Sequence, residues 1–176
     1  MDIAKMNKEI LLTKDEINAK VSEMGKLITE DYKGKKIVVI SLLKGSFIFT
    51  ADLIRNIDLP LVIEFMITSS YGHGHESSGR VKVIKDVDID ISEYDVLIVD
   101  DIIDSGNTMK NIYELLLSRN PKSLKTCTLL DKPSRRSVEF TADYTGFVIP
   151  DKFIVGYGLN YGDYYRNVDH IFAFVE

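Results

Sequence analysis

Residues 96–108 constrain the fold and chemistry of this chain more than any other segment. Four apolar residues, Val96–Val99, predict a buried strand, and the acids Asp100, Asp101 and Asp104 follow it. The next four residues are rich in hydrogen-bond donors and lead into a helical pattern: Ser105, Gly106, Asn107 and Thr108. Because N–H groups at the start of a helix attract phosphate, this order predicts a phosphate site. Since carboxylates are poor phosphate ligands, we expect them to face hydroxyls, a divalent metal or a proton, as a ribose 5-phosphate would require.

Strand-like and helix-like patterns alternate along the rest of the chain. Thr13 and Glu16 form the capping-box signature of a helix that continues to about Asp31. The alternation predicts a doubly wound α/β fold, with a mainly parallel sheet flanked by helices. We expect Val81–Ile91 to pair antiparallel at the sheet edge. We predict strands over residues 36–43, 61–67, 96–99 and 124–130, helices over 47–56 and 105–119, and a loop over 68–80.

The length of 176 residues predicts a single domain with a substantial hydrophobic core. We place this core at about residues 30–131, where the alternation is regular. Beyond Lys132 the pattern breaks into short strands and turns. We therefore expect a small C-terminal lobe over about 132–176, to which the N-terminus contributes.

Composition argues against several classes of protein. A net charge of −5 argues against a general nucleic-acid binder, which is usually basic. No apolar stretch approaches the roughly 18 residues that span a bilayer, and the N-terminal residues lack the apolar segment of a secretory signal. The single cysteine, Cys127, cannot form an intrachain disulfide and fits a core thiol. We expect a cytoplasmic protein that binds neither nucleic acid nor membranes.

The strand, acids and donor loop resemble the phosphoribosyl-diphosphate (PRPP) binding motif of type I phosphoribosyltransferases. Further segments follow in the order typical of the 6-oxopurine branch, the hypoxanthine-guanine phosphoribosyltransferase family. They are Leu43-Lys44-Gly45-Ser46, Ser70-Tyr71, Leu130-Asp131-Lys132 and Ile149–Tyr157. The acidic motif alone indicates only the superfamily, whereas the last two segments indicate the branch. The resemblance covers the chain from about Lys36 to the C-terminus and implies the type I fold with a hood lobe.

The resemblance assigns the PRPP side of the site to several residues. It implies that Asp100 and Asp101 hold the ribose hydroxyls and a Mg²⁺ ion that bridges ribose and diphosphate. The 105–108 loop binds the 5′-phosphate, and Lys44, Gly45 and Arg166 bind the diphosphate. Each of these assignments has an alternative. Asp100 and Asp101 could be solvated loop acids, Lys44-Gly45 could be an ordinary turn, and Arg166 could form an ion pair with Asp163. The peptide before Lys44 is often cis in the family, an isomer that no sequence reveals.

The resemblance also assigns the purine side. Asp104 would exchange a proton with purine N7, although an Asp here could simply cap the following helix. Lys132 would donate to the 6-oxo group, unless it is a bare surface lysine. Phe153 would stack on the base or pack in the core, and backbone groups of Val155 would read the Watson–Crick edge. Ser70 and Tyr71 begin the mobile lid.

Two further features bear on metal binding. His73, His75 and Glu76 resemble a metal motif, but glycines flank both histidines on a polar loop, so we assign this segment to the lid. Asn160 stands where the family usually carries an aspartate that contacts a second Mg²⁺. Because an amide oxygen is a weaker Mg²⁺ ligand than a carboxylate, the role of Asn160 as a metal ligand is doubtful.

Taken together, the resemblance implies transfer of the phosphoribosyl group from PRPP to N9 of hypoxanthine or guanine, by dissociative displacement at ribose C1. Mg²⁺ is the implied cofactor, and the family suggests a homodimer or homotetramer. Adenine is disfavoured because its 6-amino group would oppose the Lys132 donor. Two alternatives stay open: a phosphoribosyltransferase for xanthine or a pyrimidine, and a regulator that senses PRPP while binding RNA or a protein.

Overall fold

A computed structural model describes residues 7–70 and 81–175 of the chain, and at Ser70 its backbone only. The helices are α1 (Lys14–Asp31), α2 (Phe47–Arg55) and α3 (Asn107–Leu117), with short 3₁₀ turns η2 (Ile91–Glu93) and η3 (Pro133–Arg135). The strands are β1 (Asn7–Leu12), β2 (Ile37–Leu43), β3 (Leu61–Ser70), β4 (Val81–Lys85), β5 (Asp95–Ile103), β6 (Ser123–Asp131), β7 (Tyr144–Val148), β8 (Ile154–Val155) and β9 (Ile171–Val175). None of the helices in these ranges is long and apolar enough to cross a membrane.

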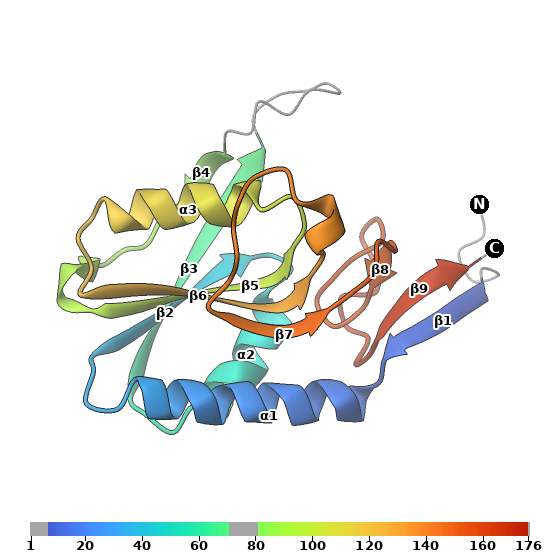
Figure 1. Ribbon diagram of the computed structural model, residues 1–176, viewed down its shortest axis with the longest axis horizontal. Coiled ribbons are helices and arrows are strands. Elements are labelled where there is room, and N and C mark those ends of the chain that lie inside the picture. The colour runs from blue at the N-terminus through green and yellow to red at the C-terminus, as the bar shows by residue number, and fades with distance from the viewer. Residues whose placement is uncertain (1–6, 71–80, 176) are drawn as a thin grey trace.

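A six-stranded sheet with the order β4-β3-β2-β5-β6-β7 forms the centre of the fold. All neighbouring strands are parallel except β4, which pairs antiparallel with β3 at the edge. Helices α1 and α2 lie on one face and α3 on the other (Figure 1). Apolar clusters fill both faces, one around Phe49 and Leu53 and the other around Met109 and Ile112. The doubly wound α/β fold and the antiparallel edge are therefore confirmed.

The capping box of α1 forms as expected. The Thr13 backbone N–H donates to the Glu16 carboxylate over 2.8 Å, and the Glu16 N–H donates to Thr13 Oγ1 over 3.3 Å. The helix then buries an apolar stripe against the sheet that includes Ile17, Val21 and Ile28. A local sequence signal and the packing of the helix thus agree on where α1 begins.

Several element boundaries differ from the prediction. Strand β5 runs through Ile103 instead of ending at Val99, so Asp100 and Asp101 lie within a strand and not in a turn after it. Pairing with β6, up to Ile103 opposite Asp131, continues the ladder beyond the apolar run. Strand β3 likewise continues to Ser70 because β4 pairs with its end, and α3 begins only at Asn107. Backbone pairing, which side-chain patterns do not reveal, extends both strands.

A second sheet of three antiparallel strands, β1-β9-β8, lies beside the main sheet (Figure 1). It joins the N-terminal strand to the C-terminal one. The expected core boundaries at about 30 and 131 are too narrow, because β7 is an edge strand of the main sheet and α1 packs on α2 and β7. The apolar pattern of β7 is short, and the pairing with β6 decides its place.

Candidate active site

The residues predicted to carry chemistry meet at one edge of the main sheet. Lys44 follows β2, Asp104 follows β5 and Lys132 follows β6. Because β2, β5 and β6 are parallel neighbours, their carboxyl ends lie together. This is where open α/β sheets bind their ligands.

The turn between β5 and α3 has the geometry of an anion site. Gly106 adopts a left-handed conformation, with φ of 86°, and is the N-cap of α3, while Ser105 Oγ accepts the Asn107 N–H over 3.2 Å. A helix N-cap role for Asp104 is therefore wrong. The following N–H groups of α3 lack intrahelical acceptors and carry the positive end of the helix dipole. A cavity of about 220 Å³ opens here, lined by Asp100, Ile102, Ile103, Asp104, Ser105, Gly106, Thr108 and Met109.

A second cavity, of about 270 Å³, lies on the other side of Asp104. It is lined by Asp101, Ile102, Asp104, Lys132, Phe153, Ile154, Leu159 and Asn160. Asp104 is thus common to both cavities, whereas Asp100 faces the first and Asp101 the second. The two neighbouring acids diverge, as extended backbone requires.

The side chains on the wall of the second cavity decide two of the alternatives. Lys132 is only 7% exposed, which contradicts a bare surface lysine, and no acid of the described residues pairs with it. Phe153 is 62% exposed, which contradicts core packing; its ring meets Tyr161 edge-on at 5.8 Å between centroids. Val155 is buried in β8 and does not line the cavity, whereas its neighbour Ile154 does. The cavity therefore offers a buried ammonium and an accessible aromatic face.

The Lys44-Gly45 turn approaches the acids closely. The Leu43-Lys44 peptide is cis. A Cβ atom on Gly45 would lie 2.0 Å from Asp101 Oδ2, so any larger residue would displace either the turn or the Asp101 carboxylate. A Cβ atom on Gly158 would meet the Gly45 carbonyl oxygen at 2.3 Å, and Arg166 donates to the Gly158 carbonyl oxygen over 2.6 Å. Arg166 is thus held beside the turn and not in an ion pair with Asp163.

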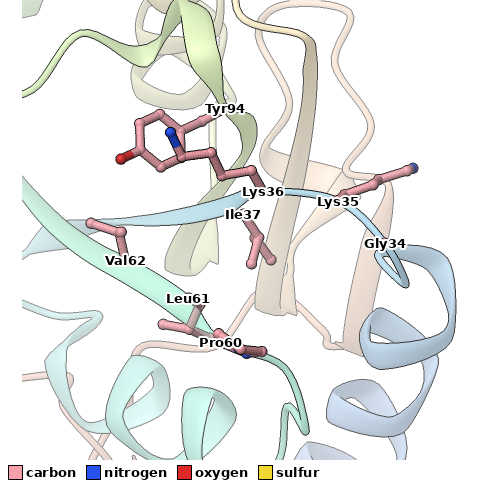
Figure 2. A pocket seen from close by; sticks show the side chains of 8 residues that line it. All are labelled: Gly34, Lys35, Lys36, Ile37, Pro60, Leu61, Val62 and Tyr94. Carbon is pink, nitrogen blue, oxygen red and sulfur yellow. The ribbon is translucent and has the colours of Figure 1, made fainter.

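A larger hollow of about 430 Å³ lies at the opposite edge of the sheet, at the start of β2 and β3 (Figure 2). The Lys36 ammonium lies over the Tyr94 ring, 4.4 Å from its centroid, while the Lys35 side chain points away. The lining residues include no carboxylate that could bind a sugar hydroxyl. Despite its size, this hollow lacks the chemistry that meets around Asp104.

Comparison with known proteins agrees with this arrangement. The chain matches the phosphoribosyl transferase domain family over residues 8–162. It is 51% identical over 165 residues to the hypoxanthine-guanine phosphoribosyltransferase of Aquifex aeolicus, with 93% of each chain covered. This chain belongs to the hypoxanthine-guanine phosphoribosyltransferase family. A hypoxanthine phosphoribosyltransferase of Salmonella typhimurium is 50% identical over 165 residues, again covering 93% of each chain.

Solved structures of this phosphoribosyltransferase family share the fold. The crystal structure of a hypoxanthine phosphoribosyltransferase from Staphylococcus aureus matches with a TM-score of 0.93 and 47% identity, over 98% of this chain and 93% of that one. A hypoxanthine-guanine phosphoribosyltransferase from Bacillus anthracis matches with a TM-score of 0.92 and 46% identity, over 97% of this chain and 100% of that one. The type I phosphoribosyltransferase fold is therefore confirmed.

Two arginines of this phosphoribosyltransferase site were missed by the sequence analysis. Arg136 forms a partly buried ion pair with Asp131 and donates to the Asp104 carbonyl oxygen over 2.7 Å. Arg135 Nε lies 3.4 Å from Asp104 Oδ1. The only sequence signal was a pair of adjacent arginines three and four residues after Lys132, and nothing local indicates that a turn returns them to the acidic loop.

The expected lid and metal-binding residues are only partly within the described structure. Tyr71 and the segment with His73 and His75 lie outside the described residues, and Ser70 is only the last residue of β3. Within the ranges 7–70 and 81–175, no group of three or more His, Cys, Asp or Glu side chains is arranged for a metal ion. Asn160 lines the second cavity and donates to the Gly162 carbonyl oxygen over 2.5 Å.

The two acids of β5 are unfavourable neighbours in the absence of a cation. Burial, and then repulsion from the charge of Asp101, raises the pKa of Asp100 well above its ordinary value. Burial also raises the pKa of Asp101, and hydrogen bonding with Asp100 and with the Ile102 N–H, followed by the smaller effect of the Arg166 charge, partly opposes this shift. The Asp101 N–H donates to Asp100 Oδ1 over 2.9 Å, so the backbone compensates only part of the cost.

We expect Asp100→Asn to stabilise the ligand-free protein at neutral pH. Because the pKa of Asp100 is raised in the folded state, ionisation of this side chain lowers the stability of the fold. The stability is therefore fully present below the ordinary pKa of 3.8 and is lost as the pH rises through the raised pKa. Asparagine mimics the protonated form, so the melting temperature at pH 7.5 should rise by about 2–4 °C, which corresponds to roughly 1 kcal/mol. Thermal unfolding of both proteins at pH 7.5 and pH 4.5 measures it, and an equal difference at both pH values would contradict the explanation.

Proposed function

We propose that this protein transfers the 5-phosphoribosyl group from PRPP to N9 of hypoxanthine or guanine. The products would be IMP or GMP and diphosphate, a reaction of purine salvage. The observation that carries the proposal is the position of Asp104 on the shared wall of the two cavities. One cavity has the donors for a phosphate and the other has a buried ammonium and an aromatic face. The C1 atom of the ribose would therefore lie between them, next to Asp104.

Different residues of the chain bind the phosphate, accept the proton and bind the diphosphate in this reaction. N–H groups at the start of α3, with Ser105 and Thr108, bind the 5′-phosphate. The bond between C1 and the diphosphate oxygen breaks, and purine N9 forms the new bond to C1. Asp104 accepts the proton that purine N7 loses. The Lys44-Gly45 turn and Arg166 bind the departing diphosphate, which keeps the bonding electrons.

The base would be selected in the second cavity. Lys132 donates to the 6-oxo group of the purine, and Phe153 stacks on its face. Because Lys132 is buried, an adenine 6-amino group would leave two donors facing each other without an acceptor. Backbone groups near Val155 and Leu159 are proposed to read the remaining edge of the base.

Mg²⁺ fits the acids of this site only together with the substrate. Burial raises the pKa values of Asp100 and Asp101, so a cation beside them would stabilise their ionised forms. Two acids cannot complete an octahedral shell, and Mg²⁺ usually takes further ligands from substrate phosphates and water. When bound, the ion would neutralise charge on the diphosphate and hold the ribose hydroxyls against Asp100 and Asp101.

A panel of bases with PRPP and Mg²⁺ tests the proposal. Diphosphate release should depend on hypoxanthine or guanine, and adenine, uracil and orotate should support release at least about 100-fold more slowly. Xanthine is the informative intermediate, because it keeps the 6-oxo group and adds a 2-oxo group. Preference for a pyrimidine would replace this proposal by another phosphoribosyltransferase activity, and PRPP binding without turnover would favour a regulator.

Lys132 provides a test of base recognition. We expect Lys132→Ala to raise KM for hypoxanthine and guanine by about 5- to 150-fold, because about 1–3 kcal/mol is lost with a buried hydrogen bond. KM for PRPP should change far less. Steady-state kinetics with each substrate varied measures the two effects, and Lys122→Ala, an exposed lysine near Glu93, is the matched control. If both KM values rose together, Lys132 would belong to the diphosphate side.

Asn160 provides a test of metal binding. We expect Asn160→Asp to shift the Mg²⁺ dependence of the rate to lower concentrations by a few-fold, because a carboxylate oxygen is a stronger ligand than an amide oxygen. Turnover at saturating Mg²⁺ should be equal or higher. A Mg²⁺ titration of both proteins at fixed PRPP measures this shift. Superimposable curves would mean that water or diphosphate, and not residue 160, holds the second ion.

Assembly and location are part of the proposal. We infer a homodimer or homotetramer, supported by large apolar side chains that stay exposed on β3 and β4, namely Phe65, Val62 and Ile84. The small sheet with β1, β8 and β9 is proposed to act as the hood over the base. A cytoplasmic location is supported by the fully buried free thiol of Cys127, which needs no oxidising compartment.

A further inference from the structure

We propose that Arg135 is a positioning residue that holds one oxygen of Asp104 and directs the other toward the substrates. The inference rests on the proposed function, since it concerns how the proton acceptor of that reaction is oriented. Arg135 ends the η3 turn, and its guanidinium lies within ion-pair distance of Asp104, before the phosphate loop, and of Asp151, before Phe153. Arg135 lies outside the segments that the chain shares with the phosphoribosyltransferase motifs, and it does not line either cavity.

The two oxygens of Asp104 are in different environments. Oδ1 has essentially no accessible surface and no hydrogen-bond partner among the described residues. The side chain as a whole is nevertheless 47% exposed. The exposed part must therefore be mainly the other oxygen, Oδ2, together with the methylene group. Since Asp104 lines both cavities, Oδ2 is the oxygen available to a bound base.

Arg135 is the cation beside the covered oxygen. Its Nε lies 3.4 Å from Asp104 Oδ1, close enough for charge attraction but without the alignment of a hydrogen bond. A covered carboxylate oxygen without any partner would be costly, so this guanidinium compensates the negative charge there. Because the two oxygens of a carboxylate are equivalent, a half-turn changes nothing, but a partial turn or a different side-chain rotamer would move the covered oxygen away from Arg135. The ion pair therefore favours the orientation of the carboxylate in which one oxygen is covered beside Arg135 and the other faces the cavities.

Arg135 also connects Asp104 to the segment that binds the base. Its Nη1 lies 3.7 Å from Asp151 Oδ2, and Asp151 precedes Phe153 by two residues. One guanidinium thus contacts an acid of the phosphate loop and an acid next to the aromatic ring. Catalytic contacts are often long in the ligand-free state and tighten when substrate binds. We infer that seating of the purine against Phe153 tightens this bridge and fixes Asp104 for proton transfer.

The inference predicts an effect on turnover and not on PRPP binding. Arg135→Ala should lower kcat by about 5- to 20-fold, less than loss of a group that touches the reacting atoms. KM for PRPP should stay within about twofold, and the melting temperature within about 2 °C, because exposed ion pairs add little stability. Arg135→Lys should restore part of the loss, and Asp151→Asn should show a smaller decrease. Lys33→Ala, which removes an exposed lysine paired with Glu30, is the control and should match the wild type.

A double-mutant cycle separates positioning from a general structural role. In the Asp104→Asn background, Arg135→Ala should change the single-turnover rate by less than twofold, because the oxygen that Arg135 orients no longer accepts the proton. An equal loss in both backgrounds would overturn the proposal, as would wild-type kcat in Arg135→Ala. If the wild-type protein itself formed no nucleotide, the proposed function would fail instead, whatever the variants do.

Discussion

Asp104→Asn should lower turnover by about 100-fold or more while PRPP binding stays close to that of the wild type. The amide keeps the size of the side chain but cannot accept the proton that the purine loses. The phosphate loop should stay intact, since Gly106 and not Asp104 caps α3. Rapid-quench measurement of the chemical step and equilibrium binding of PRPP give the two quantities separately.

A matched control is Asp163→Asn, which removes an exposed acid that lines neither of the two cavities. This variant should keep the turnover of the wild type. A near-normal chemical step in Asp104→Asn would show that another group takes the proton. Equal losses of turnover and PRPP affinity would instead place Asp104 among the ribose ligands.

Gly45→Ala should lower activity by about 100-fold or more, although the side chain gains only a methyl group. The added Cβ would lie 2.0 Å from Asp101 Oδ2, well inside contact distance, so either the turn or the carboxylate must move. Small displacements of groups that position a substrate can cost about 100-fold in rate. Steady-state kinetics and PRPP binding should both be impaired, because the turn and Asp101 are proposed to contact the same substrate.

Gly34→Asn is the control for this substitution. Gly34 has a left-handed backbone conformation, with φ of 73°, and nothing lies within 4 Å of a Cβ atom added there. Asparagine tolerates this conformation. Activity should therefore be unchanged. Activity of Gly45→Ala within about threefold of the wild type would mean that the turn relaxes freely and that its closeness to Asp101 has no function.

The main sheet was predictable because its central strands are buried on both faces and form continuous apolar runs, as in Ile37–Ile40 and Val96–Val99. The start of α1 was predictable because Thr13 and Glu16 carry a local signal. Strand β1 and the place of β7 were not, because pairing with β9 and β6 decides them over long sequence distances. The same reason explains why Asp100 and Asp101 belong to β5.

The candidate site was also predictable only where a local sequence signal places the residue. Asp104, Lys44 and Lys132 each come directly after an apolar strand, so their meeting at the carboxyl edge was predictable from the order of elements. Arg135 and Arg136 were not, because the η3 turn brings them back to the acidic loop only in three dimensions. The rejection of a helix-cap role for Asp104 likewise needed the backbone geometry at Gly106.

The most direct test of the account is the stoichiometry of products from hypoxanthine, PRPP and Mg²⁺. Phosphoribosyl transfer to the base gives one molecule of IMP for each molecule of diphosphate, and diphosphate release should be at least about 100-fold slower when the base is omitted. Chromatographic quantification of nucleotide and diphosphate from one reaction gives the ratio, and Asp104→Asn should lower both in proportion. Release of diphosphate at the same rate without a base, or without nucleotide, would contradict the account, because the base cavity around Lys132 would then have no part in the reaction.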